Sequence, residues 1–240
     1  MPHDLGSLPL KTFVEDRYKT DDYDILYSGA SGLMMKASHR LMERGIMPKS
    51  NVRVLEVGGG GMPHFYWMNS ASMQSYAVFD KIKVHEKKME ALKKALPPQI
   101  RLSLHDFDDD PSLDSVEGNF TRIIASHVLE HIHDPERAIV KWLSLLSSDG
   151  ILSIAVPCDP GWLWRLGQTF AFKGYKTSLT FQEYDLLMSR EHINSVQRIL
   201  KILRYYCRAL EIRWFPFAVP VVDFNLVCAI NLKASNIRLP

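Results

Sequence analysis

The sequence has few cysteines and no long hydrophobic run. Its three cysteines, Cys158, Cys207 and Cys228, are widely spaced, lie in apolar stretches and form no C-x-x-C pair. This pattern argues against a structural zinc site and predicts buried, reduced thiols. No stretch approaches 18 uninterrupted apolar residues, and the first residues lack a basic region followed by an apolar run. We therefore expect a cytoplasmic protein with no stable membrane insertion.

An excess of charge of either sign is also missing. The chain of 240 residues holds 29 Lys and Arg against 27 Asp and Glu, so it has no overall positive field to hold a nucleic-acid backbone. Nucleic acid is therefore not an expected partner. With 46% hydrophobic residues, the chain can bury one sizeable core, which excludes a largely disordered protein.

Short β-rich runs alternate with helical patterns in the middle of the chain, which is typical of βαβ units and a parallel sheet. The expected strands are 51–57, 75–80, 100–107, 121–126 and 150–157. We expect helices within 62–73 and 84–96, and a third from Pro135 toward Leu146, which Asp149 and Gly150 close.

The two flanks differ from this middle part. Residues 32–46 form an amphipathic helical pattern with Gly45 near its end, so residues 1–50 are expected to be a helical lid. Two β-rich runs at 209–220 and 223–234 are joined by a short connection, which favours an antiparallel hairpin at the sheet edge. The expected fold is α/β, with one domain at 51–240 and a substrate-covering insertion at about 158–205.

The strongest motif is the run VLEVGGGG at 54–61. Its glycines allow positive φ angles and a close approach of the backbone to a ligand. Glu56 precedes the first glycine by two residues, and a carboxylate there opposes a phosphate but suits a cation such as a sulfonium or an ammonium group. This disfavours a dinucleotide, whose fingerprint is G-x-G-x-x-G. The alternative is a tight turn with no ligand.

Acidic residues follow the next two strands. Asp80 ends the second strand, where a carboxylate can accept hydrogen bonds from the vicinal hydroxyls of a ribose. Asp106 and Phe107 end the third, where the acid can accept from an adenine amino group and the ring can cover its face. A strand-end aspartate is also often only a helix cap or a solvated loop residue.

These motifs together resemble a class I S-adenosylmethionine-dependent methyltransferase over about residues 50–157. The resemblance rests on E-x-G-x-G, the two strand-end acids, and ASHVLEHIHDPERAI followed by DGILSIAVP. It implies a Rossmann-like, doubly wound sheet of seven strands, mostly parallel with a C-terminal antiparallel hairpin, and S-adenosylmethionine as cofactor. Met62 departs from the family pattern, which often has a glycine at that place.

The resemblance also implies roles for individual residues. The methionine end of the cofactor would contact Glu56, Gly58, Gly59 and Gly60, the ribose would contact Asp80, and the adenine would contact Asp106 and Phe107. Ser126 and His127 would face the methionine portion and the reacting centre.

Histidine suits a hydroxyl acceptor, because a neutral imidazole can take its proton near pH 7. His127 and His131 stand four residues apart and would share a helical face, so a metal is conceivable, but a third ligand is unassigned and we expect no metal. His131 is a catalytic candidate, although it can also simply donate to a backbone carbonyl. His133 and Asp134 are expected at the surface and at the N-cap of the next helix.

A second histidine lies in REHIN, residues 190–194. This stretch and PCDPGWLWRLG resemble methyltransferases that accompany bacterial surface-polysaccharide genes. The resemblance implies His192 as general base, with Glu191 orienting it or binding a substrate hydroxyl. The alternative is that His192 only caps or packs against the helix that follows. The aromatic segment 161–175 is expected to line an acceptor pocket, to lie on a membrane or to pack in the core.

The leading hypothesis is a methyltransferase that acts on a hydroxyl of a small molecule or a glycan precursor. A non-catalytic S-adenosylmethionine-binding or scaffold protein of the same fold is the alternative from another class, and a nicotinamide oxidoreductase is the third. The pattern leaves open the acceptor, the attacked atom and the oligomeric state.

Overall fold

A computed structural model describes residues 29–47, 49–59, 61–80, 82–106, 113, 116–174 and 180–238. Its centre is a seven-stranded sheet in the order β3-β2-β1-β4-β5-β7-β6. The strands are β1 (Val52–Val57), β2 (Met73–Asp80), β3 (Arg101–Asp106), β4 (Phe120–Ser126), β5 (Leu146–Pro157), β6 (Glu211–Pro216) and β7 (Asn225–Lys233). The first five are parallel, and β7 is antiparallel to both β5 and β6. The expected fold, including the C-terminal hairpin, is confirmed.

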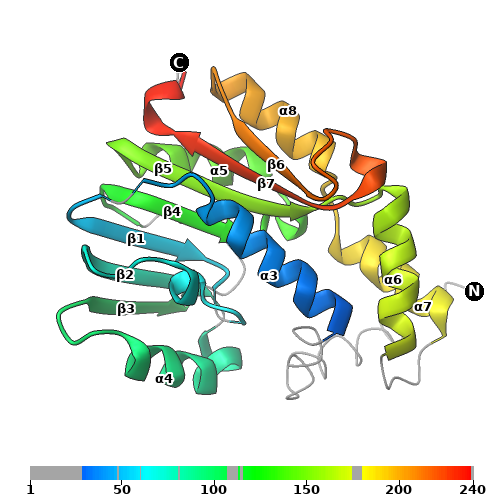
Figure 1. The fold of residues 1–240 in the computed structure, drawn as a ribbon, viewed down its shortest axis with the longest axis horizontal. Helices are drawn as coiled ribbons and strands as arrows, with labels where there is room; N and C mark the ends of the chain where they lie inside the picture. The colour runs from blue at the N-terminus through cyan, green and yellow to red at the C-terminus, as the bar shows by residue number, and fades with distance from the viewer. Residues whose placement is uncertain are drawn as a thin grey trace, which may run out of the picture.

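Helices cover both faces of this sheet (Figure 1). The α-helices are α3 (Gly29–Glu43), α4 (Glu86–Ala95), α5 (Pro135–Ser144), α6 (Trp162–Gly174), α7 (Phe181–Glu191) and α8 (Val196–Tyr206). In Figure 1, α3 crosses the front of the sheet, and α5 lies behind it. Short 3₁₀ turns are η2 (His64–Trp67), η3 (Ile82–His85), η4 (Leu129–His131), η5 (Val222–Phe224) and η6 (Ala234–Asn236).

Alternation along the strands divides the core into two layers. Successive strand residues point to opposite faces, so Leu55 and Ile123 pack with α5 and α8, while Val54 and Ile124 pack with α4 and the end of α3. Because both faces are covered by helices, the inner strands are apolar almost throughout. The polar exceptions in these strands, such as Glu56 and Arg122, are buried and form hydrogen bonds with other parts of the protein.

The strand order reverses between β1 and β4, which is where open α/β sheets form a crevice at the carboxyl ends of their strands. The loops after these two strands start at Gly58 and His127. The sheet therefore brings the glycine motif next to the histidine-rich segment, although about seventy residues separate them in the chain.

Two local predictions are wrong. The segment 62–73 forms only the short turn η2 and not a helix, because the backbone N–H of His64 donates to Glu56 and the ring of Phe65 packs edge-on against Tyr76. The helix α5 ends at Ser144, so Asp149 and Gly150 do not close it but lie inside β5.

The prediction that the cysteines are buried thiols is confirmed. Cys158, Cys207 and Cys228 are buried free thiols, and burial raises the pKa of Cys158 to about 12 and that of Cys207 to about 11. Thiols with such high pKa values are poor nucleophiles. In the part of the chain described here, no helix has the length and apolar character needed to cross a membrane.

Candidate active site

The loop after β1 turns on two glycines that have no room for a side chain. Gly58 has a φ of +74°, and a Cβ atom there would lie 2.3 Å from Val128 Cγ2. A Cβ atom at Gly59 would lie 2.3 Å from the carboxyl carbon of Glu56. Gly60 lies outside the described residues. The backbone path at the end of β1 therefore requires glycine at both described positions.

The buried side chain of Glu56 positions this loop by hydrogen bonds. Its side chain is 1% exposed, its Oε1 accepts from His64 N at 2.8 Å, and its Oε2 accepts from Tyr76 Oη at 2.5 Å. Burial raises the pKa of Glu56 to about 8, although the hydrogen bonds from Tyr76 and His64 partly oppose this and Asp80 adds to it. Both oxygens thus serve protein donors, and the first role of Glu56 in the structure is to position the loop.

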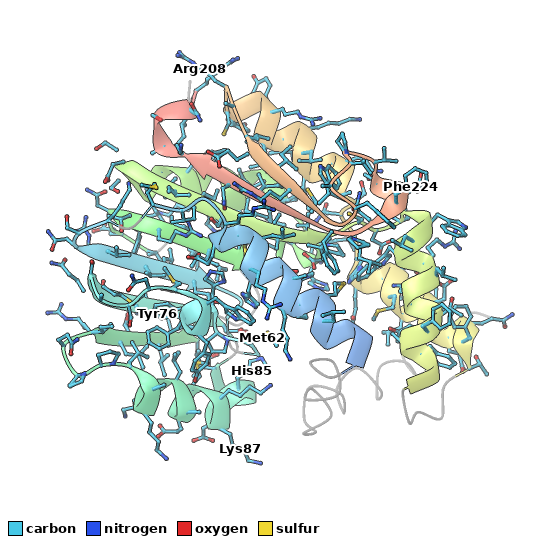
Figure 2. All side chains as sticks on the ribbon, in the orientation of Figure 1. Met62, Tyr76, His85, Lys87, Arg208 and Phe224 are labelled. Carbon is cyan, nitrogen blue, oxygen red and sulfur yellow. The ribbon has the colours of Figure 1, made fainter. Side chains whose placement is uncertain are left out.

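The two strand-end carboxylates are neighbours, as expected from parallel pairing. Asp80 on β2 and Asp106 on β3 are register partners. Asp106 Oδ1 accepts from the backbone N–H of Ile82 at 3.1 Å, so it also orders the loop that enters α4. Met62 and His85 lie on the loops that leave β1 and β2 (Figure 2). Phe107 lies outside the described residues.

The chain bends sharply after β4. Ser126, the last residue of β4, is buried, and its Oγ has no hydrogen-bond partner among the described residues. His127 has a φ of +56°, and its Nε2 lies 2.9 Å from Ser38 Oγ on α3. Its Nδ1 lies 3.4 Å from Glu130 Oε1.

This bend overturns the prediction that His127 and His131 share a helical face. His127 has left-handed backbone angles, and only Leu129–His131 form a single 3₁₀ turn. His127 consequently contacts α3, whereas the ring of His131 stacks edge-on against His192 with ring centroids 5.0 Å apart. The prediction that Asp134 caps the following helix is confirmed, because its side chain accepts from Arg137 N.

A polar cluster forms where the segment after β4 meets the end of α7. Glu130, His131 and His192 each offer one donor atom, and these atoms lie within 4.8 Å of one another. Burial alone would raise the pKa of Glu130, but the hydrogen bond with His127 and the nearby imidazoles of His131 and His192 outweigh burial, so this pKa is lowered.

The orienting residue for His192 differs from the prediction. His192 Nδ1 lies 2.8 Å from Asp159 Oδ2, and the carbonyl oxygen of Glu191 instead accepts from His131 Nδ1 at 2.9 Å. Burial lowers the pKa of His192, but Asp159 together with Glu130 outweighs it, and the net shift is upward. Trp164 is buried beside His192, with ring centroids 5.7 Å apart.

Sequence reasoning missed Asp159 and a buried network under α3. In that network Glu43 Oε1 lies 2.8 Å from His64 Nε2 and accepts from Arg122 Nη2 at 2.7 Å. Burial would raise the pKa of Glu43, but His64 and Arg122 outweigh it and lower that pKa. The signal was a lone arginine inside the apolar strand FTRIIAS, because a buried charge needs a partner.

Comparisons with known proteins agree with this arrangement. The CurJ carbon methyltransferase has a similar structure, with a TM-score of 0.63, 16% identity, and coverage of 96% of this chain and 62% of that chain. This chain thus spans less than two thirds of CurJ. The N-methyltransferase NodS from Bradyrhizobium japonicum WM9, solved with S-adenosyl-L-homocysteine, has a TM-score of 0.60 and 13% identity, and the match covers 93% of this chain and 97% of that chain.

The same fold occurs in a protein of another activity. The [4+2]-cyclase SpnF matches with a TM-score of 0.54 and 15% identity, covering 86% of this chain and 82% of that chain. At such identities these likenesses show the fold alone. A search of curated proteins found no match. A family model described as a methyltransferase domain matches residues 28–201, well over half of the chain, and the protein therefore belongs to this family of methyltransferases.

Proposed function

We propose that this methyltransferase acts on an oxygen atom of a small molecule or a glycan precursor. S-adenosylmethionine is its methyl donor, and the solved NodS structure, which shares the fold, contains S-adenosyl-L-homocysteine, the demethylated form of that donor. When bound, the donor supplies an electrophilic methyl group on a sulfonium centre. The protein must therefore hold the donor, align the acceptor oxygen and accept the acceptor's proton.

The described residues fit the donor at the crevice between β1 and β4. Gly58 turns the backbone at the end of β1, and Ser126 Oγ at the end of β4 is buried with no hydrogen-bond partner among the described residues. The observation that carries the proposal is this combination, because an unpartnered buried hydroxyl costs free energy unless a ligand bonds to it. Glu56, Gly59 and His127 are assigned to the methionine end, and the sequence motif assigns Gly60 there too, although it lies outside the described residues.

The neighbouring carboxylates suit the adenosine end. Asp80 is half-buried at the end of β2, where it can accept hydrogen bonds from the ribose hydroxyls. Asp106 is the register partner of Asp80 and is assigned to the adenine. Phe107, which the sequence motif assigns to the same end, lies outside the described residues. One oxygen of Asp106 accepts from Ile82 N, and each carboxylate oxygen can accept more than one hydrogen bond.

We place the acceptor on the side of His127 that faces Glu130, opposite the methionine end of the donor. Glu130 lies 3.4 Å from His127 and forms the cluster with His131 and His192, so a hydroxyl held by the two histidines lies next to the methionine end of the donor. His192 and His131 bind this hydroxyl and promote the loss of its proton. In this proposal α3 and the described parts of the insertion, 158–174 and 180–205, cover the acceptor, and Trp164 packs against His192 from within that insertion. Of the expected lid, residues 1–28 lie outside the described residues.

A sugar is the favoured class of acceptor. The stretches REHIN and PCDPGWLWRLG resemble those of methyltransferases that accompany surface-polysaccharide genes. A contact between the two stretches supports this choice, because Asp159 of the second contacts His192 of the first. The hydroxyl groups of a sugar also match the pair of histidines, which can bind one hydroxyl between them.

Calorimetry with S-adenosylmethionine, its demethylated product and NADH tests the donor site. We expect heat with the first two and none with NADH. Release of the demethylated product is then measured with sugars, lipids and amines as acceptors. Turnover with sugars supports the proposal. Turnover with amines alone overturns the assignment to oxygen.

A variant separates an enzyme from a non-catalytic donor-binding protein. In His192→Ala we expect unchanged donor affinity and a turnover lower by a factor of about a hundred or more, since a positioned imidazole contributes roughly 10² to 10⁴ in rate. His133→Ala, at an exposed position of the segment after β4, is the control and should keep full turnover. Binding of the donor without turnover on any acceptor contradicts the proposal that the protein is an enzyme.

A further inference from the structure

The cluster of Glu130, His131 and His192 has features that a proton acceptor alone does not require. It joins the turn after β4 to the end of α7, and its three donor atoms lie within 4.8 Å of one another. The side chains of Glu130 and His192 are 1% and 10% exposed, while that of His131 is 42% exposed. The cluster is therefore a buried group of ligating atoms with one side open.

Both imidazoles are oriented through the same ring nitrogen. Nδ1 of His192 lies 2.8 Å from a carboxylate oxygen of Asp159, and Nδ1 of His131 lies 2.9 Å from the carbonyl oxygen of Glu191. Carboxylate and carbonyl oxygens only accept hydrogen bonds, so Nδ1 carries a proton in both rings, and in the neutral form of each ring Nε2 has the lone pair that a cation can bind. Metal-binding histidines are typically held in this way by a carboxylate or a backbone carbonyl.

The third donor is a carboxylate with an uncommitted oxygen. Glu130 Oε1 lies 3.4 Å from His127 Nδ1 and 3.9 Å from His131 Nε2. Its Oε2 is buried and has no hydrogen-bond partner among the described residues. A buried carboxylate oxygen without a partner is unfavourable, and a cation held with the two imidazole nitrogens would relieve this.

We propose that Glu130, His131 and His192 bind one divalent first-row transition metal ion, and that this ion activates the acceptor hydroxyl. This inference rests on the proposed function. Two imidazoles favour Zn²⁺, Fe²⁺, Ni²⁺ or Mn²⁺ over Mg²⁺ and Ca²⁺, which prefer oxygen ligands. Donor atoms in a tetrahedral site lie about 3.4 Å apart, whereas these three lie within 4.8 Å of one another, so the side chains must move closer together to bind the ion.

Three protein ligands leave positions open for the acceptor, as in catalytic metal sites. With the ion bound, the two histidines act on the acceptor through the metal and not by direct hydrogen bonds. The acceptor oxygen binds the ion, which lowers the pKa of the hydroxyl, and its proton passes to solvent on the open side next to His131. A lone pair of this oxygen then forms the new C–O bond to the methyl carbon, while the C–S bond breaks and its electron pair stays on sulfur. The metal keeps its oxidation state throughout.

The test uses the full chain without an affinity tag, freed of metal with a chelator. Titration with Zn²⁺, Mn²⁺ and Mg²⁺ is followed by calorimetry. We expect one Zn²⁺ or Mn²⁺ per chain and at least tenfold weaker binding of Mg²⁺. His131→Ala should weaken Zn²⁺ binding at least tenfold, and its exposed position makes loss of the fold a minor concern. His133→Ala is the matched control and should bind Zn²⁺ as the unmodified protein does.

A second variant tests the outer contacts. Asp159→Asn should weaken Zn²⁺ binding by a factor of roughly 10 to 100, as is typical when the hydrogen-bond partner of a ligating histidine is changed. Absence of a bound ion, or Zn²⁺ binding that His131→Ala leaves unchanged, overturns the metal site.

Donor binding distinguishes this failure from a failure of the proposed function. S-adenosylmethionine is titrated into the metal-free protein, where we expect it to bind. If it binds and turnover continues at full rate without metal, the metal inference is wrong and the proposed function stands. If it does not bind with or without Zn²⁺, the proposed function is wrong.

Discussion

At the scale of single residues, Glu56 is the clearest case of a side chain whose environment sets its chemistry. It is enclosed between the loop at Gly59 and the hydroxyl of Tyr76. Burial disfavours its charged form, which raises its pKa to about 8. Its two accepted hydrogen bonds, from His64 N and Tyr76 Oη, position the loop.

This pKa predicts a dependence of stability on pH. Because the pKa of Glu56 is about 8 in the folded state and about 4.5 in the unfolded state, the folded state holds an extra proton between these values. The contribution of Glu56 to the free energy of unfolding therefore falls as pH rises from about 5 to 8. Glu56→Gln does not titrate and should remove this part of the decline. Urea unfolding at several pH values measures it.

The control for this prediction is Glu90→Gln, at an exposed position on α4, which should leave the pH dependence unchanged. Other titrating groups contribute equally to all three proteins, so the difference between them isolates Glu56. An identical decline in Glu56→Gln and in the unmodified protein contradicts the argument.

A substitution of Gly58 gives a second prediction at the scale of single residues. Gly58→Ala adds a methyl group that collides with Val128 and imposes a φ of +74° on a residue with a Cβ atom. We expect lower stability and at least tenfold weaker binding of S-adenosylmethionine, measured by calorimetry.

Gly45→Ala is the matched control for this variant. Gly45 also has a positive φ, of +81°, but it follows α3, and the nearest atom to an added Cβ belongs to the side chain of Arg213. This variant should lose stability yet keep its affinity for the donor. Equal affinity in both variants would show that the loop after β1 does not contact the donor.

At the scale of elements, α3 is attached to the sheet by polar side chains. Asn231 on β7 donates to the carbonyl oxygen of Met42 near the end of α3, at 2.8 Å, and Arg122 on β4 donates to the same oxygen at 3.2 Å. The last carbonyl groups of a helix have no partner within the helix. The sheet supplies these partners, so α3 ends at a defined place on the face that carries Glu56 and Ser126.

A substitution of Asn231 tests how much this contact between α3 and the sheet contributes to stability. It is 4% exposed and accepts from Ser153 Oγ at 2.5 Å. Asn231→Ala removes one partner of the Met42 carbonyl group and leaves the Ser153 hydroxyl buried and unsatisfied, at a cost of about 1–3 kcal/mol in the free energy of unfolding. Urea unfolding measures this, and Asn236→Ala, at a half-buried position with only a 3.5 Å side-chain hydrogen bond to Ala209, should change it by less than about 0.5 kcal/mol.

At the scale of the whole molecule, the strand order decides where the chemistry lies. The reversal between β1 and β4 places the donor loop and the histidine segment side by side, and the chain then returns through α6 and α7 to bring His192 to the same end of the sheet. Figure 1 shows α6 and α7 together beyond one end of the strands.

This arrangement predicts a global stabilisation by the donor. A ligand that binds only the folded state adds RT ln(1 + [L]/Kd) to the free energy of unfolding, about 2.7 kcal/mol at a concentration a hundred times Kd. We expect S-adenosylmethionine to raise the midpoint of urea unfolding of the whole chain, and NADH to leave it unchanged. A rise with NADH alone points instead to a nicotinamide enzyme.

The sequence by itself determined the strands, the order of the βαβ units and the glycine loop. These depend on local periodicity and on residues such as Gly58 and Asp134, whose backbone or capping roles act within a few positions. It could not determine the bend at His127, because a left-handed histidine depends on contacts with α3 and Glu130 that lie outside any local pattern.

Only the tertiary structure decided which polar groups share a site. The partner of His192 is Asp159 and not its neighbour Glu191, and the third donor beside the two histidines is Glu130. Side chains that are far apart in the chain meet because the sheet brings together the carboxyl ends of its strands. Their distances, burial and protonation states follow from that packing, which no spacing in the sequence encodes.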